Sequence, residues 1–299
     1  MIRVTSDQMH RALIGRIQEA QTRVMETTDQ ISSGYRINRP SDDPVATAQV
    51  MDLLSSQRHL QQYNQSITQA RAWSVASEGA LNQGLEIYQR SRDLVLQATS
   101  ESTNAQGRQS IVTELNAIID SVKMLGNSKV GNDFIFSGAK ASTPAYLMTA
   151  SDAYQGDTTL IKREISPGNQ VAINLTADTI FGNDTSGFLK TLRDLVTNIS
   201  TGTQATLQTA RTTGLQGLDA ASTAMSNARS QLGEMQNRLD FHETRISDMS
   251  GSNDELLSML RDTDLAKASA AYAQRQASLM AALKTGQQVV QPSLIDFLK

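Results

Sequence analysis

The sequence predicts a mainly α-helical protein with a small β insertion, in which both termini form a long coiled-coil helical hairpin or bundle around a central β domain. Three observations predict this fold. Apolar residues recur about every 3.5 positions near both ends, no proline interrupts 45–143 or 168–291, and the middle of the chain is rich in Gly, Thr and Asn. Of 299 residues, 39% are hydrophobic and 4% aromatic, which favours narrow helical seams over the thick core of a compact enzyme.

The first predicted helix spans about 5–32. Its apolar positions are separated alternately by four and three residues, which is the spacing of a coiled-coil seam. The pattern stops at Ser33, and Gly34 can adopt the left-handed conformation that often ends a helix. The predicted seam residues of this helix are Leu13, Ile17, Ala20, Val24, Thr27 and Ile31.

A turn is predicted between this helix and the next. Asp43 directly precedes Pro44, which is the order expected of an N-capping residue and a proline at the first helical position. The helix that begins there is predicted to reach about Ser100, and a third helix to span 105–128. The seam of the third helix consists of Ile111, Leu115, Ile118, Val122 and Leu125.

The middle of the chain, 131–187, is predicted to form the β insertion. Phe134–Phe136 is expected to be one strand, and 159–165 and 170–175 two more. The last two strands flank Ser166-Pro167-Gly168-Asn169, whose residue types favour a tight turn. A short helix over 188–199 is predicted to lead out of the insertion.

The longest periodic pattern lies near the C-terminus, where thirteen positions follow steps of three and four over about six heptads. A final helix is predicted over 265–290, ending at Pro292 before an apolar tip. The tip residues are Leu294, Ile295, Phe297 and Leu298. The thirteen seam positions are Leu218, Ala221, Met225, Ala228, Leu232, Met235, Leu239, His242, Ile246, Met249, Asn253, Leu256 and Leu260.

The sequence therefore predicts five segments. An N-terminal coiled-coil helix and turn occupies 1–43, and a helical body occupies 44–130. The β-rich insertion covers 131–187. Returning helices with the long heptad helix cover 188–260, and a C-terminal coiled-coil helix covers 261–299.

Composition argues against several functional classes. The formal net charge of −3 gives no basis for nucleic-acid binding, and no apolar run approaches the roughly 18–20 residues of a membrane span. The first residues lack the apolar core of a signal peptide. There is no cysteine, and the three histidines lie far apart in the sequence, so we expect no metal site and no cofactor.

Two motifs resemble those of serine β-lactamases, and a serine hydrolase is therefore one alternative. Ser137–Lys140 matches S-x-x-K, and Lys284-Thr285-Gly286 matches K-T-G. In those enzymes the serine opens a buried helix and K-T-G lies on a strand. Here Ser137 follows a predicted strand and Lys284 lies in a helical pattern, so the enzyme interpretation is disfavoured.

Polar residues in the patterns have structural interpretations. His242 and Asn253 occupy seam positions whose neighbours are apolar, which favours a role in helix register over metal binding or catalysis. Asp42 and Asp43 could act as an acid–base or Mg²⁺-binding pair, but their place at a helix start favours capping.

The turn carries a family resemblance. Ile31–Pro44 reads I-S-S-G-Y-R-I-N-R-P-S-D-D-P, and it resembles the signature of the flagellin superfamily, which also follows an N-terminal heptad helix. Its proline-flanked form, with Phe134–Gly138 and Tyr154–Asp157, is more similar to the hook–filament junction proteins of that superfamily than to filament flagellins, which usually have Ala after the acidic pair. Asp262–Ala268 and the C-terminal tip resemble the superfamily's closing helix.

The resemblance implies a flagellin-like fold and a structural, non-enzymatic protein. Its implied partners are other copies of itself in a tubular polymer, hook-associated protein 1, flagellin and an export chaperone. Export through the flagellar type III apparatus without a cleaved signal, to the flagellum outside the cell, is also implied. Filament flagellin and a coiled-coil export substrate acting as an effector or tip protein are the remaining alternatives. The expected assembly turn consists of Ser33, Gly34, Arg36, Asn38, Asp42, Asp43 and Pro44, and the expected polymerisation and chaperone-binding site is the C-terminal tip.

Overall fold

The computed structural model describes residues 3–149 and 151–295, with side chains described for 8, 10–149 and 151–287. The chain divides into two compact units. One unit combines the N-terminal part through His59 with the C-terminal part from Asp248, and the other is Leu60–Ser247. These two units do not test the five-segment division, which stays a prediction.

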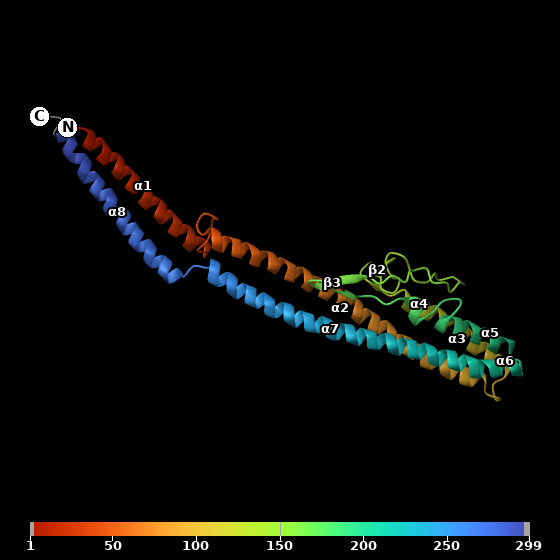
Figure 1. Ribbon diagram of the computed structural model, residues 1–299. Coiled ribbons are helices and arrows are strands. Elements are labelled where there is room, and N and C mark those ends of the chain that lie inside the picture. The colour runs from red at the N-terminus through yellow and green to blue at the C-terminus, as the bar shows by residue number, and fades with distance from the viewer. Residues whose placement is uncertain (1–2, 150, 296–299) are drawn as a thin grey trace. The chain divides into compact units, whose positions relative to one another are not determined.

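Helices dominate the described residues, as predicted (Figure 1). The predicted helices are all present, with ends shifted by a few residues. A short helix α4, a short helix α6 and a π-helical turn were not predicted. The elements are α1 (Arg3–Ser33), α2 (Pro44–Ala98), α3 (Ala105–Gly126), β1 (Lys129–Val130), β2 (Asp133–Phe134), β3 (Lys162–Ser166), β4 (Asn169–Ala172), α4 (Ala177–Ile180), α5 (Gly187–Thr201), α6 (Gln204–Thr209), the π-helical turn Ala210–Gly214, α7 (Leu215–Arg261) and α8 (Leu265–Ile295).

In the first unit, α1 and α8 lie side by side and antiparallel (Figure 1). The predicted seam of α1 faces α8, and most of its side chains are half-buried. Thr27 is buried, and the guanidinium of Arg275 on α8 donates to its Oγ at 2.7 Å. Near the other end of the pair, Gly286 lies against Leu13 and Ile17.

The second unit contains the main hydrophobic core, to which α2, α3, α5 and α7 contribute. The seam of α3 is confirmed, since Ile111, Leu115, Ile118 and Val122 are buried and Leu125 packs against the core. Loops of the β insertion close this core with aromatic side chains. Phe136 meets Phe181 edge to face, with ring centroids 5.8 Å apart.

The strands are shorter than predicted. The described residues form two separate antiparallel hairpins, β1–β2 and β3–β4, instead of one extended strand and a longer pair. Ile135 and Phe136 follow β2 as buried loop residues because they pack into the helical core. The turn after Ser166 is confirmed, and Gly168 there has a φ of 71°.

The predicted seam of α7 holds for most of its length and then shifts by one residue. Leu232, Leu239 and Ile246 are buried, but Leu256 is 44% exposed while Leu257 is only 6% exposed. The prediction of Leu256 as a seam residue is therefore wrong. A straight α-helix drifts by about 20° per heptad from a 3.5-residue period. After four heptads the drift is about 80°, which approaches the angle of about 100° between adjacent residues, so the next residue then lies on the buried side.

The end of the last helix also differs from the prediction. α8 continues to Ile295 with Pro292 inside its final turn, where the missing N–H costs one helical hydrogen bond close to the terminus. Leu294 and Ile295 belong to that turn, but their side chains lie outside the described residues, as do Phe297 and Leu298 altogether. None of the helices described combines the length and apolarity needed to span a bilayer.

Candidate functional site at the turn between the first two helices

Gly34 ends α1 in the left-handed conformation that the sequence predicts. Its φ is 75°, and its N–H donates to the carbonyl oxygen of Gln30 at 3.0 Å. The hydroxyl of Ser33 then accepts the N–H of Tyr35 at 3.1 Å, which directs the chain away from the helix axis. A side chain at position 34 would be strained by this backbone conformation, although the space that its Cβ would occupy is open.

Asp42 holds the interior of the turn together. Its Oδ2 accepts the backbone N–H groups of Asn38 at 3.0 Å and Arg39 at 2.8 Å. The side-chain amide of Asn38 donates to the carbonyl oxygen of Tyr35 at 3.3 Å. These bonds replace the helical partners that the backbone lacks between α1 and α2.

Asp43 caps α2, as its position before Pro44 predicts. Its Oδ1 accepts the N–H of Ala46 at 3.0 Å, and its Oδ2 lies 3.5 Å from the guanidinium of Arg36. The hydrogen bond from Ala46 and the contact with Arg36 hold the pKa of Asp43 below its ordinary value. Among the described residues no cluster of His, Asp or Glu is suited to hold a metal ion.

The turn is hydrogen-bonded to the end of α7 and to the link between α7 and α8, residues 262–264. The N–H of Arg36 donates to the carbonyl oxygen of Arg261 at 2.6 Å, and its guanidinium to that of Leu260 at 2.7 Å. The N–H of Thr263 donates to the carbonyl oxygen of Gly34 at 2.9 Å. The guanidinium of Arg261 also lies 3.9 Å from the ring centroid of Tyr35.

Four helix ends are therefore satisfied within one small region. α1 ends at Gly34, α2 begins at Asp43, the last carbonyls of α7 accept from Arg36, and Asp264 accepts the N–H groups of Ala266 and Lys267 at the start of α8. The structure thus brings all seven predicted turn residues together. The contact of this turn with the link 260–264 was not predicted from the sequence, although Asp262–Ala268 carries part of the family resemblance.

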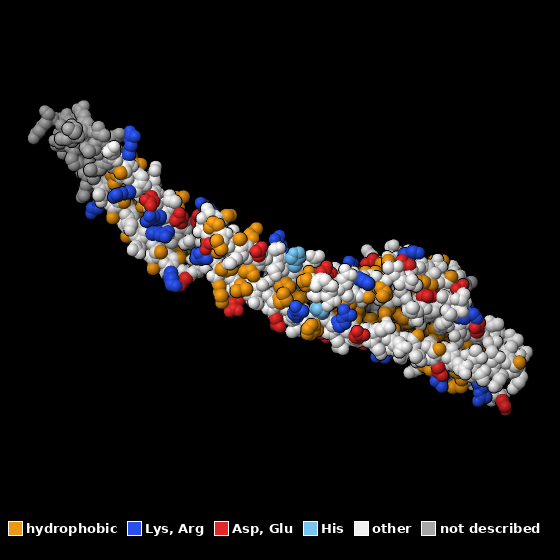
Figure 2. All heavy atoms as spheres, in the orientation of Figure 1, with side chains coloured by type: hydrophobic (Ala, Val, Ile, Leu, Met, Phe, Trp, Pro, Cys, Tyr) orange, Lys and Arg blue, Asp and Glu red, His pale blue; other side chains and the backbone are white. Residues whose placement is uncertain are grey.

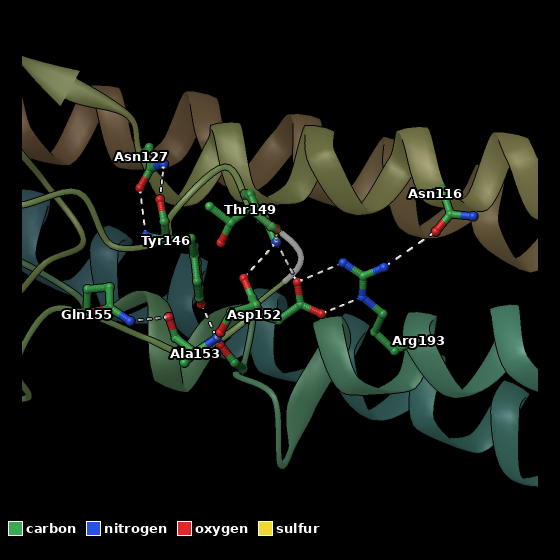
Figure 3. Close-up of polar contacts among 11 residues, drawn as sticks. Asn116, Asn127, Tyr146, Thr149, Asp152, Ala153, Gln155 and Arg193 are labelled. Carbon is green, nitrogen blue, oxygen red and sulfur yellow. Dashed lines mark hydrogen bonds and ion pairs between the residues drawn. The ribbon is translucent and has the colours of Figure 1, made fainter.

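A second polar cluster, between the β insertion and the helices α3 and α5, was not predicted (Figure 3). The fully buried Nζ of Lys123 lies 2.6 Å from Asp152 and donates to the carbonyl oxygens of Thr149 and Ser151. Arg193 on α5 binds the other carboxylate oxygen of Asp152 at 2.6 Å. The cluster joins three segments that lie far apart in the sequence, and no local pattern marks it.

The residues of the alternative enzyme interpretation are not assembled into a catalytic arrangement. Ser137 is fully buried, and its hydroxyl has no hydrogen-bond partner among the described residues. Lys140 is exposed, and Lys284 lies on α8. Among the residues that the structure describes, no base contacts the hydroxyl that would act as the nucleophile.

Comparison with known sequence families gives two matches. The bacterial flagellin N-terminal helical region matches residues 4–141, and the bacterial flagellin C-terminal helical region matches 215–298. Flagellar hook-associated protein 3 of Escherichia coli K12 is 24% identical over 304 aligned positions, covering 95% of both chains. A flagellin of Bacillus subtilis is 26% identical and covers 85% of both chains. These relatives are structural proteins of the flagellum.

Solved structures share the fold. Flagellar hook-associated protein 3 from Legionella pneumophila aligns with a TM-score of 0.64 at 16% identity, over 71% of this chain and 98% of that one. FlgL of Xanthomonas campestris aligns with a TM-score of 0.61 at 16% identity, over 69% and 99%. The mainly α fold with a small β insertion is therefore that of these flagellar proteins.

Proposed function

Since this chain belongs to the bacterial flagellin family, we propose that it is a subunit of the hook–filament junction, where copies of it form a tubular segment between hook-associated protein 1 and flagellin. The observation that carries this proposal is the extent of the similarity to hook-associated protein 3. It covers 95% of both chains and therefore includes the β insertion as well as the terminal helices.

Association with further copies of the chain is supported by the terminal helix pair. The side chains of its seam are mostly half-buried, and large apolar side chains of both helices are exposed. An open groove of about 640 Å³ also runs over the pair, lined among others by Leu13, Ile17 and Leu283. Apolar surface of this kind is typical of an interaction site. These exposed apolar side chains are Ile14 (55% exposed), Met25 (65%), Met280 (62%) and Leu283 (38%).

The turn from Ser33 to Pro44 is the proposed assembly element. It connects α1 with α2 and is hydrogen-bonded to the link between α7 and α8. Its polar groups satisfy the end of α1, the start of α2 and the end of α7, whereas Asp264 caps α8. The turn therefore lies at the end of the α1–α8 pair at which α1 ends and α8 begins. Figure 2 shows charged side chains of both signs on this part of the surface, with hydrophobic side chains between them.

Export is proposed to proceed through the flagellar type III apparatus without a cleaved signal, with a dedicated chaperone covering the C-terminal tip. The sequence supports chaperone binding at the tip, since residues 294–299 include four bulky apolar residues. The tip is also the proposed polymerisation site, because burial of four such side chains contributes several kcal/mol at about 1.5–3 each.

A truncated gene tests the proposal. A strain that lacks the gene is complemented with the full chain or with a chain lacking 292–299, and motility and flagellin in the medium are measured. We expect the full chain to restore swimming, and the truncated chain to be folded but to leave flagellin shed into the medium. Normal swimming with the truncated chain would contradict the role of the tip.

Filament flagellin is the second candidate, favoured by the similarity to the flagellin of Bacillus subtilis over 85% of both chains. The two candidates predict different complementation. A junction subunit restores filaments only in a strain that lacks its own junction protein, whereas a filament subunit restores them in a strain without flagellin.

A further inference from the structure

His242 on α7 is a buried seam residue in contact with the β3–β4 hairpin. Its side chain is 7% exposed, and its Nε2 lies 3.0 Å from the side-chain nitrogen of Asn169, the first residue of β4. The other ring nitrogen, Nδ1, is buried without a hydrogen-bond partner. The imidazole thus fastens the tip of the hairpin to the helix through one hydrogen bond.

The orientation of Asn169 fixes which atom donates in this bond. The guanidinium of Arg238 lies 3.5 Å from Oδ1 of Asn169 and can only donate, so the amide oxygen faces Arg238 and the NH₂ group faces His242. Nε2 of His242 must then be the acceptor, which requires the neutral imidazole. A proton on Nε2 would place two hydrogen-bond donors opposite each other. Rotation of the Asn169 amide by about 180° would not relieve this, because its NH₂ group would then face the guanidinium of Arg238, which is also a donor.

The charges around the imidazole also favour its neutral form. Burial and the cations Arg245 and Arg238 lower the pKa of His242 below 6.5. The carboxylates on the elements packed here already have other partners, so they do not offset these cations. Glu164 on β3 accepts the N–H of Gly168 and bonds to Tyr63 of α2, and Asp240 and Glu243 pair with Arg71 of α2.

We propose that His242 is a proton-sensitive latch, which holds the β3–β4 hairpin on α7 when neutral and releases it when protonated. Release would expose Ile165 and Val171, which are 0% and 3% exposed in the closed state. The latch thus makes an apolar face of the β insertion available in acid. This inference goes beyond the proposed function and does not depend on it.

Hydrogen exchange of the full-length protein, measured by mass spectrometry from pH 7.5 to 5, tests the latch. After correction for the intrinsic pH dependence of exchange, we expect exchange in peptides covering 162–172 to rise as the pH falls below 6.5. One proton limits the rise to about tenfold per pH unit. Peptides from α3 serve as the internal reference and should stay constant.

Two variants separate the latch from a general effect of acid. His242→Gln cannot take up a proton, and its amide oxygen can still accept from Asn169, so its hairpin should show no rise. The matched control His59→Gln removes an exposed histidine and should keep the rise. An equal rise in His242→Gln and the unchanged protein would overturn the proposal.

A direct titration covers the case in which His242→Gln does not fold. NMR of the unchanged protein should show the imidazole of His242 titrating below pH 6.5, with the side-chain amide signal of Asn169 following the same transition. A pKa of His242 at or above 6.5, or an amide signal that does not follow it, would overturn the latch.

Discussion

The guanidinium of Arg36 donates a hydrogen bond of 2.7 Å to the carbonyl oxygen of Leu260, 224 residues away in the sequence. Leu260 and Arg261 are the last two residues of α7, whose final four carbonyls have no partner within the helix. Arg36 satisfies one of them with its side chain and another with its backbone N–H. Its positive charge also lies at the negative end of the helix dipole.

Replacement of Arg36 should loosen this connection. Arg36→Ala removes the side-chain bond but keeps the backbone bond to Arg261, so we expect a local loss of about 1 kcal/mol, the usual contribution of one hydrogen bond. Hydrogen exchange of 258–264 measures it, since these amides should exchange faster. Arg36→Lys keeps the charge and should recover part of the protection. Unchanged exchange in Arg36→Ala would show that the contact contributes nothing to the link.

Asp43 gives a prediction with a defined pH dependence. Its pKa is lowered in the folded chain, so its contribution to stability is complete above the ordinary value of 3.8 and is lost as the pH falls through the lower folded value. Asp43→Ala should therefore weaken protection of the first turn of α2 at pH 7 and differ little from the unchanged protein at the lowest pH. Asp43→Asn is the matched control, because asparagine also caps helices. A difference between Asp43→Ala and the unchanged protein that persists at the lowest pH would contradict the assignment.

The buried cluster of Lys123, Asp152 and Arg193 should be among the most sensitive sites of the second unit. Asp152→Ala leaves Lys123 buried without its counter-ion, and breaking a buried pair in this way costs about 3–5 kcal/mol. The control is Lys123→Met with Asp152→Leu, which removes both buried charges and should cost less than Asp152→Ala alone. Thermal unfolding of the three proteins provides the comparison, and a larger loss in the double variant would contradict it.

The same cluster should make the second unit less stable in acid. Burial alone would raise the pKa of Asp152, but the hydrogen bonds from Arg193 and Lys123 outweigh it and hold the pKa below 3.8. The stabilisation is therefore complete above about pH 3.8 and is lost as the pH falls further. Asp152→Asn has no carboxylate at this position. The loss of unfolding free energy between neutral and acidic pH, taken from unfolding curves at several pH values, should therefore be smaller in Asp152→Asn than in the unchanged protein.

Local chemistry made the turn predictable, whereas its long-range contacts were not. Gly34, Asp43 and Pro44 act on their immediate neighbours, so their residue types and order were sufficient to predict a helix end, a cap and a helix start. The bond from Arg36 to Leu260 and the cluster at Asp152 join segments distant in the sequence. No spacing rule connects such segments, and a single sequence offers no covariation.

The seam of α7 shows how far a periodic pattern can be extended. The strict heptad predicted the buried positions up to Ile246, because drift over a few heptads is smaller than the angle between adjacent residues. At Leu256 the drift has reached about one residue, so the buried position is Leu257 instead of Leu256. A pattern with a 3.6-residue period would have predicted the shift.

The last prediction concerns Gly286, a glycine inside α8. A Cβ at this position would lie 3.5 Å from atoms of Leu13 and Ile17, which is ordinary van der Waals contact. Gly286→Ala should therefore fit the α1–α8 pair and stabilise α8 by about 0.5–1 kcal/mol, the difference between these residues in a helix interior. Circular dichroism during heating should show helix retained to a higher temperature. A loss of helix in Gly286→Ala would mean that α8 packs on α1 more closely than these contacts indicate.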